Sequence, residues 1–435
     1  MVPTPRLWLV LAIGIPLSGL AASVGAYGWI VAYNLGVLGL AFLTTRLAGD
    51  LRGVKVRRQT DAVLSVRVKN RVEVELVHDG DRAYSGWVLD QPPSDYGIEG
   101  NHVRFRLEPG GTFTFSYSVT PGERGSDRFE ATYFRIECPL GLAWRDIRLE
   151  TEAPIRVYPN LLALREFDLL NQLGRLREVG IRRSRLRGTG TEFESLRDYA
   201  LGDDYRKIDH KASARRGKLV VRQFETERNQ SVFLVIDTGR HMLSEVYGVR
   251  KLDHVLDSLL MLCNAAASAS DLVGLLVYSD TVRRYIPPRK GRNQVGFVIE
   301  ACHDLVAEPL ESDFISAIGY LRTKWKRRSL IVVFSDYEDP DRAGELVTAL
   351  APLAHRHIVL VVRVQDGRLQ EVETAPLAKP QDMYMRVAAN LLLEDRKEAS
   401  KRLRSAGIHE LESEPQELAS KLVTFYFDVK ARGLL

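Results

Sequence analysis

The chain has 435 residues, of which 45% are hydrophobic and 27% charged, as is ordinary for a globular protein. This length predicts two or three domains, and the small net charge of +5 gives no reason to expect nucleic acid as a partner. The three cysteines lie far apart in the sequence, which argues against a disulfide framework or a zinc site.

Residues 7–45 carry no charged side chain. Because about 20 apolar residues span a bilayer, this segment has room for two spans, near Leu7–Ala22 and Trp29–Thr44, joined by a short turn. Basic residues on both sides predict, by the positive-inside rule, that both ends and the bulk of the chain lie in the cytoplasm. We therefore expect residues 1–48 to form a transmembrane helical hairpin in the lipid bilayer of the inner (cytoplasmic) membrane. The alternative is a signal peptide cleaved near Ala26, followed by a single anchor.

Residues 49–160 show the alternation of apolar and polar side chains that is typical of strands buried on one face. About seven short strands at this spacing predict a small all-β, sandwich-like domain. No catalytic constellation is visible there, so we interpret the domain as a spacer or interaction module. The clearest strands are expected at Val63–Val68, Val72–Leu76, His102–Leu107, Thr112–Val119, Asp127–Ile136 and Ala153–Tyr158.

Residues 161–230 read as a charged connector. Its first part, Leu161–Arg187, has leucines at near-helical spacing and predicts a basic amphipathic helix. The following charges include no nucleophile arrangement or metal-ligand spacing, so we predict no catalytic residues there. We interpret them as a salt-bridged connector clamped against the next domain, or as a surface that docks a partner. The candidate docking residues are Arg197, Asp203, Asp204, Arg206, Asp209 and Arg215.

Residues 231–435 alternate apolar strands with helices, which predicts a doubly wound, mostly parallel α/β sheet covered on both faces. Strands are expected at Ser231–Asp237, Leu272–Tyr278, Ser329–Ser335, His357–Val364 and Ile408–Leu411, with an antiparallel edge strand at Thr281–Ile286. Helices are expected at Leu252–Ala269, Asn293–Val306, Asp313–Lys324, Ala343–His355, Arg386–Ala406 and Glu414–Lys430. Ligands of such sheets bind at the carboxyl ends of the strands.

Several short motifs follow one another in the connector: Phe193, Leu196–Tyr199, Gly202-Asp203-Asp204, Arg206, Ile208-Asp209, Lys211–Arg215 and Phe224-Glu225. In this order they strongly resemble the family called domain of unknown function 58 (DUF58), although His210 stands where that family usually has tryptophan. The resemblance implies an N-terminal membrane hairpin, a β-rich segment and a von Willebrand factor A-like (VWA-like) domain. It also implies a partner, a MoxR-type AAA+ ATPase, together with other VWA or membrane proteins.

The resemblance to VWA domains also implies a divalent-cation site built from Asp-x-Ser-x-Ser, a threonine and an aspartate on three loops. Here the first loop keeps Asp237, but Gly239 and His241 replace its two serines. Ser312 replaces the threonine, and Asp336 is the third-loop aspartate. Carboxylate and hydroxyl oxygens suit Mg²⁺, whereas glycine offers no ligand and imidazole is a poor one. Two interpretations stay open: a degenerate Mg²⁺ site of Asp237, Ser312 and Asp336, or aspartates that act as structural caps.

The favoured hypothesis is a membrane-anchored, non-enzymatic adaptor whose cytoplasmic VWA-like domain docks a protein partner in a chaperone-like or complex-assembly role. One alternative is a metal-dependent hydrolase or nuclease that uses Asp237 and Asp336 with the Gly202-Asp203-Asp204 loop. Another is an envelope-facing ligand-binding protein, which requires the opposite orientation. The chain has no glycine loop of the phosphate-cradling type followed by Lys-Ser/Thr, so it is not itself a P-loop ATPase.

Overall fold

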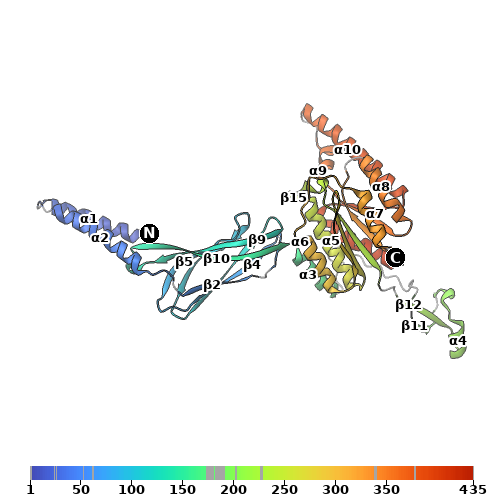
Figure 1. The fold of residues 1–435 in the computed structure, drawn as a ribbon, viewed down its shortest axis with the longest axis horizontal. Helices are drawn as coiled ribbons and strands as arrows, with labels where there is room; N and C mark the ends of the chain where they lie inside the picture. Colours follow the sequence, from blue (N-terminus) through green and yellow to red (C-terminus); the bar gives the residue numbers. More distant parts are fainter. Residues whose placement is uncertain are drawn as a thin grey trace. The chain divides into compact units, whose positions relative to one another are not determined.

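The computed structural model groups the chain into two compact units, Met1–Asn160 and Leu161–Leu435 (Figure 1). The four-part division expected from the sequence is finer than this and stays a prediction. The residues that the structure describes are 2–23, 25, 27–51, 53–60, 63–172, 181, 192–200, 203–225, 229–337, 340–376 and 379–434.

The first unit begins with two apolar helices, α1 (Pro5–Ser23) and α2 (Tyr27–Leu47). Both are long and apolar enough to cross a membrane, and most of their large apolar side chains are exposed. The two helices pack against each other, and the Tyr33 hydroxyl donates a hydrogen bond to the Val10 carbonyl at 2.6 Å. Exposed apolar surface on this scale needs a lipid environment, so the pair indicates a membrane protein.

A β-sandwich follows the helices and confirms the expected all-β domain. One sheet has the order β1-β10-β9-β5-β7, with β3 beside β10, and the other has the order β2-β4-β8-β6. Alternate side chains of both sheets meet in one core. The strands are β1 (Val2–Pro3), β2 (Val54–Thr60), β3 (Val63–Ser65), β4 (Asn70–His78), β5 (Tyr84–Asp90), β6 (Gly97–Glu99), β7 (His102–Leu107), β8 (Thr112–Thr120), β9 (Gly125–Glu137) and β10 (Ala143–Tyr158).

The last strand of the sandwich is longer than the sequence suggested. We expected it to begin at Ala153, but β10 begins at Ala143 and pairs with β9 along its length. Between Trp144 and Pro154 the side chains of β10 are only half-buried or exposed, so this part of the strand lacks the fully buried apolar face that marks its end. A register shift between Glu150 and Ala153 indicates a bulge in its pairing with β9.

The second unit opens with α3 (Leu161–Gln172), the first part of the helix expected over Leu161–Arg187. Residues 173–180 and 182–187 lie outside the described residues. Further along, β11 (Glu192–Asp198) and β12 (Val220–Glu225) form an antiparallel pair. Between these strands lie a 3₁₀ turn and the short helix α4 (His210–Arg216). We call residues 192–225 the connector hairpin.

The rest of the unit is a six-stranded sheet with the order β17-β16-β13-β18-β19-β20. All neighbours are parallel except β17, which pairs antiparallel with β16, so the expected edge strand is confirmed. That strand does not end before Pro287, because an edge strand tolerates residues that lack an amide donor. The strands are β13 (Ser231–Asp237), β16 (Leu272–Tyr278), β17 (Val282–Arg289), β18 (Leu330–Phe334), β19 (Ile358–Val364) and β20 (His409–Ser413).

Helices cover both faces of this sheet, as the sequence predicted for a doubly wound fold. On one face lie α5 (Lys251–Ser268), α6 (Arg292–His303) and α11 (Pro415–Ala431). On the other face lie α7 (Phe314–Lys324), α8 (Pro340–Ala354) and α10 (Pro380–Ser405). Outside these layers, α9 (Arg368–Thr374) packs against α10, and β14 (Glu245–Val246) pairs with β15 (Val249–Arg250).

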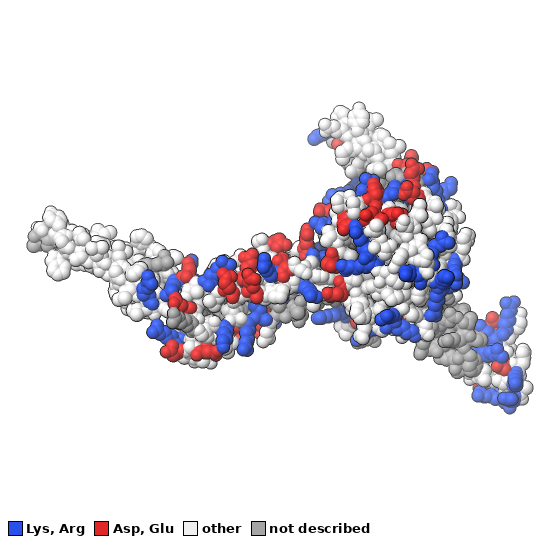
Figure 2. Space-filling model, viewed as in Figure 1, with Lys and Arg blue, Asp and Glu red and all other residues white. Residues whose placement is uncertain are grey.

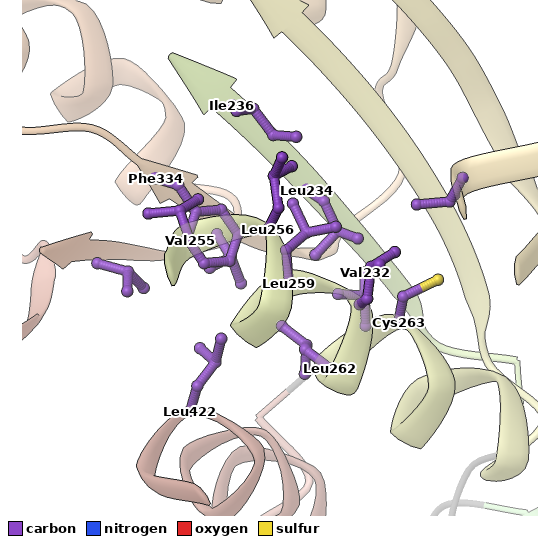
Figure 3. Packing of buried hydrophobic residues seen from close by; sticks show 14 of the residues in the cluster. Val232, Leu234, Ile236, Val255, Leu256, Leu259, Leu262, Cys263, Phe334 and Leu422 are labelled. Atoms are coloured by element: carbon purple, nitrogen blue, oxygen red, sulfur yellow. The ribbon is translucent and has the colours of Figure 1, made fainter. Parts of the chain in front are cut away.

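Residues 232–236 of the central strand β13 are all apolar, because both faces of the strand are buried. Val232, Leu234 and Ile236 point toward α5, where Leu256 and Leu259 pack against them (Figure 3). The intervening side chains of β13 belong to the core on the opposite face. A strand with both faces buried needs apolar residues at every position.

The strand order places a topological switch point at the carboxyl ends of β13 and β18. The chain runs from β13 to one side of the sheet and later returns through β18 to the other side. Ligands of doubly wound sheets bind at such a point. Asp237 and Asp336 are the residues that lie there.

Candidate functional site

Asp237 ends β13 and is completely buried. Its Oδ1 accepts hydrogen bonds from the Ser312 hydroxyl at 2.5 Å and from the Gly239 amide at 2.8 Å. Its Oδ2 accepts a hydrogen bond from the Ser335 hydroxyl at 2.6 Å. Burial raises the pKa of Asp237, while these three hydrogen bonds oppose that rise. The structure therefore brings Asp237 and Ser312 into direct contact and adds Ser335.

Asp336 follows β18 and is only 3% exposed. Its Oδ2 lies 2.5 Å from Nζ of Lys251, the first residue of α5. Its Oδ1 lies 3.2 Å from Nε of Arg363 in β19 and accepts a hydrogen bond from the Tyr337 amide at 2.9 Å. Burial alone would raise the pKa of Asp336, but the charges of Lys251 and Arg363 hold it below its ordinary value.

Arg363 in β19 links the ion pairs of Asp336 to further charged residues in β20 and α10. Its Nη1 lies 3.2 Å from Oε1 of Glu410, which also accepts a hydrogen bond from the Tyr337 hydroxyl at 2.6 Å. Glu412 lies 3.8 Å from both Arg363 and Arg396. The buried edge thus holds a chain of alternating charges in which each ion has a partner, as buried charges require.

This arrangement does not fit a divalent cation. Both oxygens of Asp237 accept hydrogen bonds, and both oxygens of Asp336 face cationic side chains. A Cβ atom on Gly239 would lie 2.0 Å from the Ser312 Oγ and 2.9 Å from the Leu310 carbonyl oxygen, so a serine has no room there. Among the described residues, no group of three or more His, Cys, Asp or Glu side chains could hold a metal ion. An octahedral Mg²⁺ needs six oxygen ligands, and here the ammonium of Lys251 takes the place of the cation.

The neighbouring loop residues have local structural roles. Arg240 forms an ion pair with Glu311 at 2.8 Å on the surface, and His241 is buried. Asp313 caps α7 by accepting a hydrogen bond from the Ser316 amide at 2.9 Å. The contacts at this edge favour the interpretation that Asp237 and Asp336 act as caps and ion-pair partners.

Several connector residues contact one another within the connector hairpin. Arg197 and Asp203 form a two-pronged ion pair at 2.7 and 2.6 Å. Asp209 caps α4 through the Ala212 amide and also pairs with Arg222. The Asp204 carboxylate accepts a hydrogen bond from the Arg206 amide at 3.0 Å.

No described ion pair joins the connector hairpin to the six-stranded sheet. Our expectation that its charges clamp it against the α/β domain stays a prediction. The ion pairs instead stabilise the hairpin itself. Arg215 lies on the exposed surface of α4. A docking role for these residues stays a prediction.

Sequence reasoning missed Lys251, Ser335, Arg363 and Glu410. One signal was available: Arg363 interrupts the otherwise apolar run of β19. A cation inside a buried strand needs a carboxylate partner, so Arg363 predicted an acidic group nearby. Lys251 had no comparable signal, because the start of a helix commonly lies at the surface.

Residues 195–394 match the family described as "Protein of unknown function DUF58". The chain is 26% identical over 183 residues to the uncharacterized protein Rv1480 of Mycobacterium tuberculosis (strain ATCC 25618 / H37Rv). This match covers 42% of the chain and 57% of that relative, so the chain spans little more than half of its length. The uncharacterized protein YeaD of Bacillus subtilis (strain 168) is 30% identical over 128 residues, or 29% of this chain and 31% of YeaD.

Among solved structures, the conserved hypothetical protein BatB from Bacteroides thetaiotaomicron is similar at 13% identity. The match covers 47% of this chain and all of that structure, with a TM-score of 0.33. The VWA-like fold itself rests on the strand order and helix layers described above. The family recognised in the connector is confirmed, and the chain carries a DUF58 region at residues 195–394 next to its apolar N-terminal helices.

Proposed function

We propose that this chain is a membrane-anchored, non-enzymatic adaptor whose VWA-like unit docks a protein partner. The observation that supports this best is an exposed apolar stripe on α10. Tyr384, Val387, Ala388 and Leu391 recur at the i, i+3, i+4, i+7 spacing of one helix face. Their large side chains are strongly exposed, at 79% for Tyr384, 53% for Val387 and 58% for Leu391. We call these four residues the α10 stripe.

The α10 stripe has no cover among the described residues. On a different face of the helix, α9 packs against α10, and Arg386 donates a hydrogen bond to the Ala375 carbonyl near the end of α9. Figure 2 shows few charged side chains over the projecting end of α10. An amphipathic helix that presents anchors at this spacing is recognised by an apolar groove of another protein. The stripe therefore supports a protein partner.

The buried edge supports binding rather than catalysis. A hydrolase or nuclease that used Asp237 and Asp336 would need carboxylate oxygens free for a metal or for proton transfer. Here those oxygens are engaged by Ser312, Ser335, Lys251 and Arg363. The metal-dependent alternative would first have to displace Lys251 from Asp336.

The partner class and the orientation come from the sequence. Resemblance to DUF58 proteins implies a MoxR-type AAA+ ATPase, whose ATP hydrolysis would drive a chaperone-like or complex-assembly step. Arg6 and Arg46 flank the apolar helices and favour an inner-membrane hairpin with the VWA-like unit in the cytoplasm. Reporter fusions at the carboxyl terminus test this orientation. A reporter active only outside the cytoplasm would favour the envelope-facing alternative.

Co-purification tests the docking proposal. The detergent-solubilised chain is isolated from its own cells as wild type, as Tyr384→Asp and as Leu391→Asp. The control is Ile315→Asp on α7, where the side chain is 61% exposed, close to the 58% of Leu391. Because a central apolar anchor contributes about 2 kcal/mol or more to binding, we expect both stripe variants to lose the ATPase and the control to retain it. An ATPase bound equally to all variants would refute the α10 stripe, and none with wild type would refute this partner.

A further inference from the structure

A cavity of about 460 Å³ lies between α10 and the carboxyl ends of β19 and β20. Four basic side chains from α10 line it: Arg396, Lys397, Lys401 and Arg404. Two acidic residues face them, Asp366 just after β19 and Glu412 in β20. We call this the basic cavity.

The positive charges of the basic cavity are only partly compensated. Glu412 already pairs with Arg363 and Arg396 at 3.8 Å. Asp366 accepts a hydrogen bond from the Arg368 amide at 3.1 Å. Within the described part of the chain, no carboxylate lies within ion-pair distance of Lys397, Lys401 or Arg404. Cations gathered around one cavity repel each other, so a bound anion would lower the energy of this arrangement.

We propose that the basic cavity binds a small ligand through a phosphate group that carries at least two negative charges. Its volume is within the range of small-molecule sites. Guanidinium and ammonium groups are the main phosphate-binding side chains of proteins. The hydroxyl of Ser400 and the amide of Gln365 also line the cavity and can donate hydrogen bonds.

The ligand class follows from the lining. Among the residues that the structure describes, no aromatic side chain lines the cavity, so a nucleobase would find no described ring on which to stack. The basic residues converge on one compact space, which suits a single multiply charged group better than an extended acidic peptide. The site is also at the carboxyl edge of the parallel strands, where doubly wound sheets bind ligands.

The basic cavity is connected to the buried edge. Arg396 lines the cavity and also pairs with Glu412, whose other partner is Arg363. Arg363 in turn pairs with Asp336. A phosphate that attracts Arg396 would weaken the ion pair between Arg396 and Glu412. Glu412 would then pair with Arg363 alone, so ligand binding would alter the charge balance around Asp336.

Calorimetry on the full chain in neutral detergent micelles tests the site, with inorganic pyrophosphate as the probe. The variants are Lys397→Gln and Lys401→Gln, and the control is Lys326→Gln, an exposed lysine just after α7. Each change removes one positive charge at the surface, where substitutions have little effect on folding. We expect wild type and control to bind alike and the Kd of each cavity variant to rise about tenfold, which corresponds to one lost charged contact.

A second arm separates free phosphate from a lipid headgroup. Short-chain phosphatidic acid is titrated into the same micelles, with short-chain phosphatidylcholine as the reference lipid. The site is supported if either phosphate probe binds more weakly to Lys397→Gln and Lys401→Gln but not to Lys326→Gln. The probe that behaves in this way shows whether the phosphate group belongs to a free ligand or to a lipid. The proposal is overturned if neither probe binds wild type, or if all variants bind equally. Binding of a polyglutamate peptide alone would also overturn it, in favour of an acidic protein segment.

Discussion

The ammonium Nζ of Lys251 lies 2.5 Å from Oδ2 of Asp336, and both side chains are almost completely buried. A VWA metal site would place a divalent cation at this edge of the sheet. Here α5 supplies a positive charge that is part of the chain itself, and Arg363 supplies a second. The edge is therefore neutralised without an ion from solution.

Removing the ammonium should destabilise the VWA-like unit. Lys251→Met leaves the buried Asp336 with one cationic partner, so we expect the free energy of unfolding to fall by about 3 kcal/mol. The matched control is Lys421→Met, whose exposed pair with Glu417 should contribute at most about 0.5 kcal/mol. Urea unfolding followed by hydrogen exchange in β13 and β18 measures both. Equal losses for the two variants would mean that the buried pair has no special weight.

Restoring the serine of the metal motif should not restore a metal site. Gly239→Ser places a Cβ against the Leu310 carbonyl and the Ser312 hydroxyl, so the loop must shift. We expect this overpacking to lower the free energy of unfolding by about 1–3 kcal/mol. Gly319→Ala in α7 is the control, because a Cβ there meets nothing within 4 Å. Alanine in a helix interior should stabilise by about 0.5–1 kcal/mol. A stable Gly239→Ser variant that gains Mg²⁺ affinity would contradict this prediction.

The thermal midpoint of the wild type should be the same in MgCl₂ and in EDTA. A cation present at 100 times its Kd would add about 2.7 kcal/mol to the stability of the folded state. Lys251 and Arg363 already occupy the surroundings of Asp336, so we expect no such gain. Differential scanning calorimetry makes the comparison. A midpoint that rises with Mg²⁺ in wild type but not in Asp237→Ala would show that the degenerate site binds metal after all.

We expect the titration of Asp237 to make the free energy of unfolding depend on pH. Burial raises the pKa of Asp237, so its carboxyl group binds a proton more tightly in the folded state than in the unfolded state. Its contribution to stability is complete below the ordinary value of 3.8 and is lost as pH rises through the folded pKa. The stability of wild type relative to Asp237→Asn should therefore fall as pH increases above 3.8.

Asp304 provides a control of opposite sign for the pH experiment. Its hydrogen bonds with Arg284 lower its pKa, so its contribution is present above 3.8 and is lost as pH falls through the folded pKa. Wild type should lose stability relative to Asp304→Asn on acidification. Denaturant midpoints across the pH range test both slopes. A pH-independent difference between wild type and Asp237→Asn would contradict the raised pKa.

In the connector hairpin, Asp209 should act mainly as a helix cap. Its carboxylate accepts a hydrogen bond from the Ala212 amide at 2.9 Å and pairs with Arg222 on the exposed surface. Asp209→Ala should lower the local stability of α4, whereas Asp209→Asn keeps a capping oxygen and should lower it less. Hydrogen exchange of the α4 amides measures the difference. If both variants lost equal protection, the ion pair with Arg222 would be the dominant contact.

The element order was readable from local patterns. A continuous apolar run such as Val232–Ile236 identifies a strand buried on both faces, and helical spacing identifies the covering helices. The same patterns missed the first ten residues of β10, because the side chains from Trp144 to Pro154 are only half-buried or exposed and form no buried apolar face. The apolar stretch between Arg6 and Arg46 was equally clear, since length and lack of charge are properties of the sequence itself.

The sequence by itself determined the order of strands and helices, the apolar N-terminal pair and the DUF58 motifs, because each depends on neighbours along the chain. Only the tertiary structure decided the state of the sheet edge. Asp336 meets Lys251 and Arg363, and Asp237 meets Ser312, although the partners are distant in sequence. These contacts form only when β13, β18 and β19 are aligned and α5 packs over them. Likewise, the absence of room at Gly239 depends on the Leu310 carbonyl, which a separate loop places there. The sequence shows how many side chains could offer oxygen ligands. Only the packing of the chain decides which other groups already form hydrogen bonds or ion pairs with those oxygens.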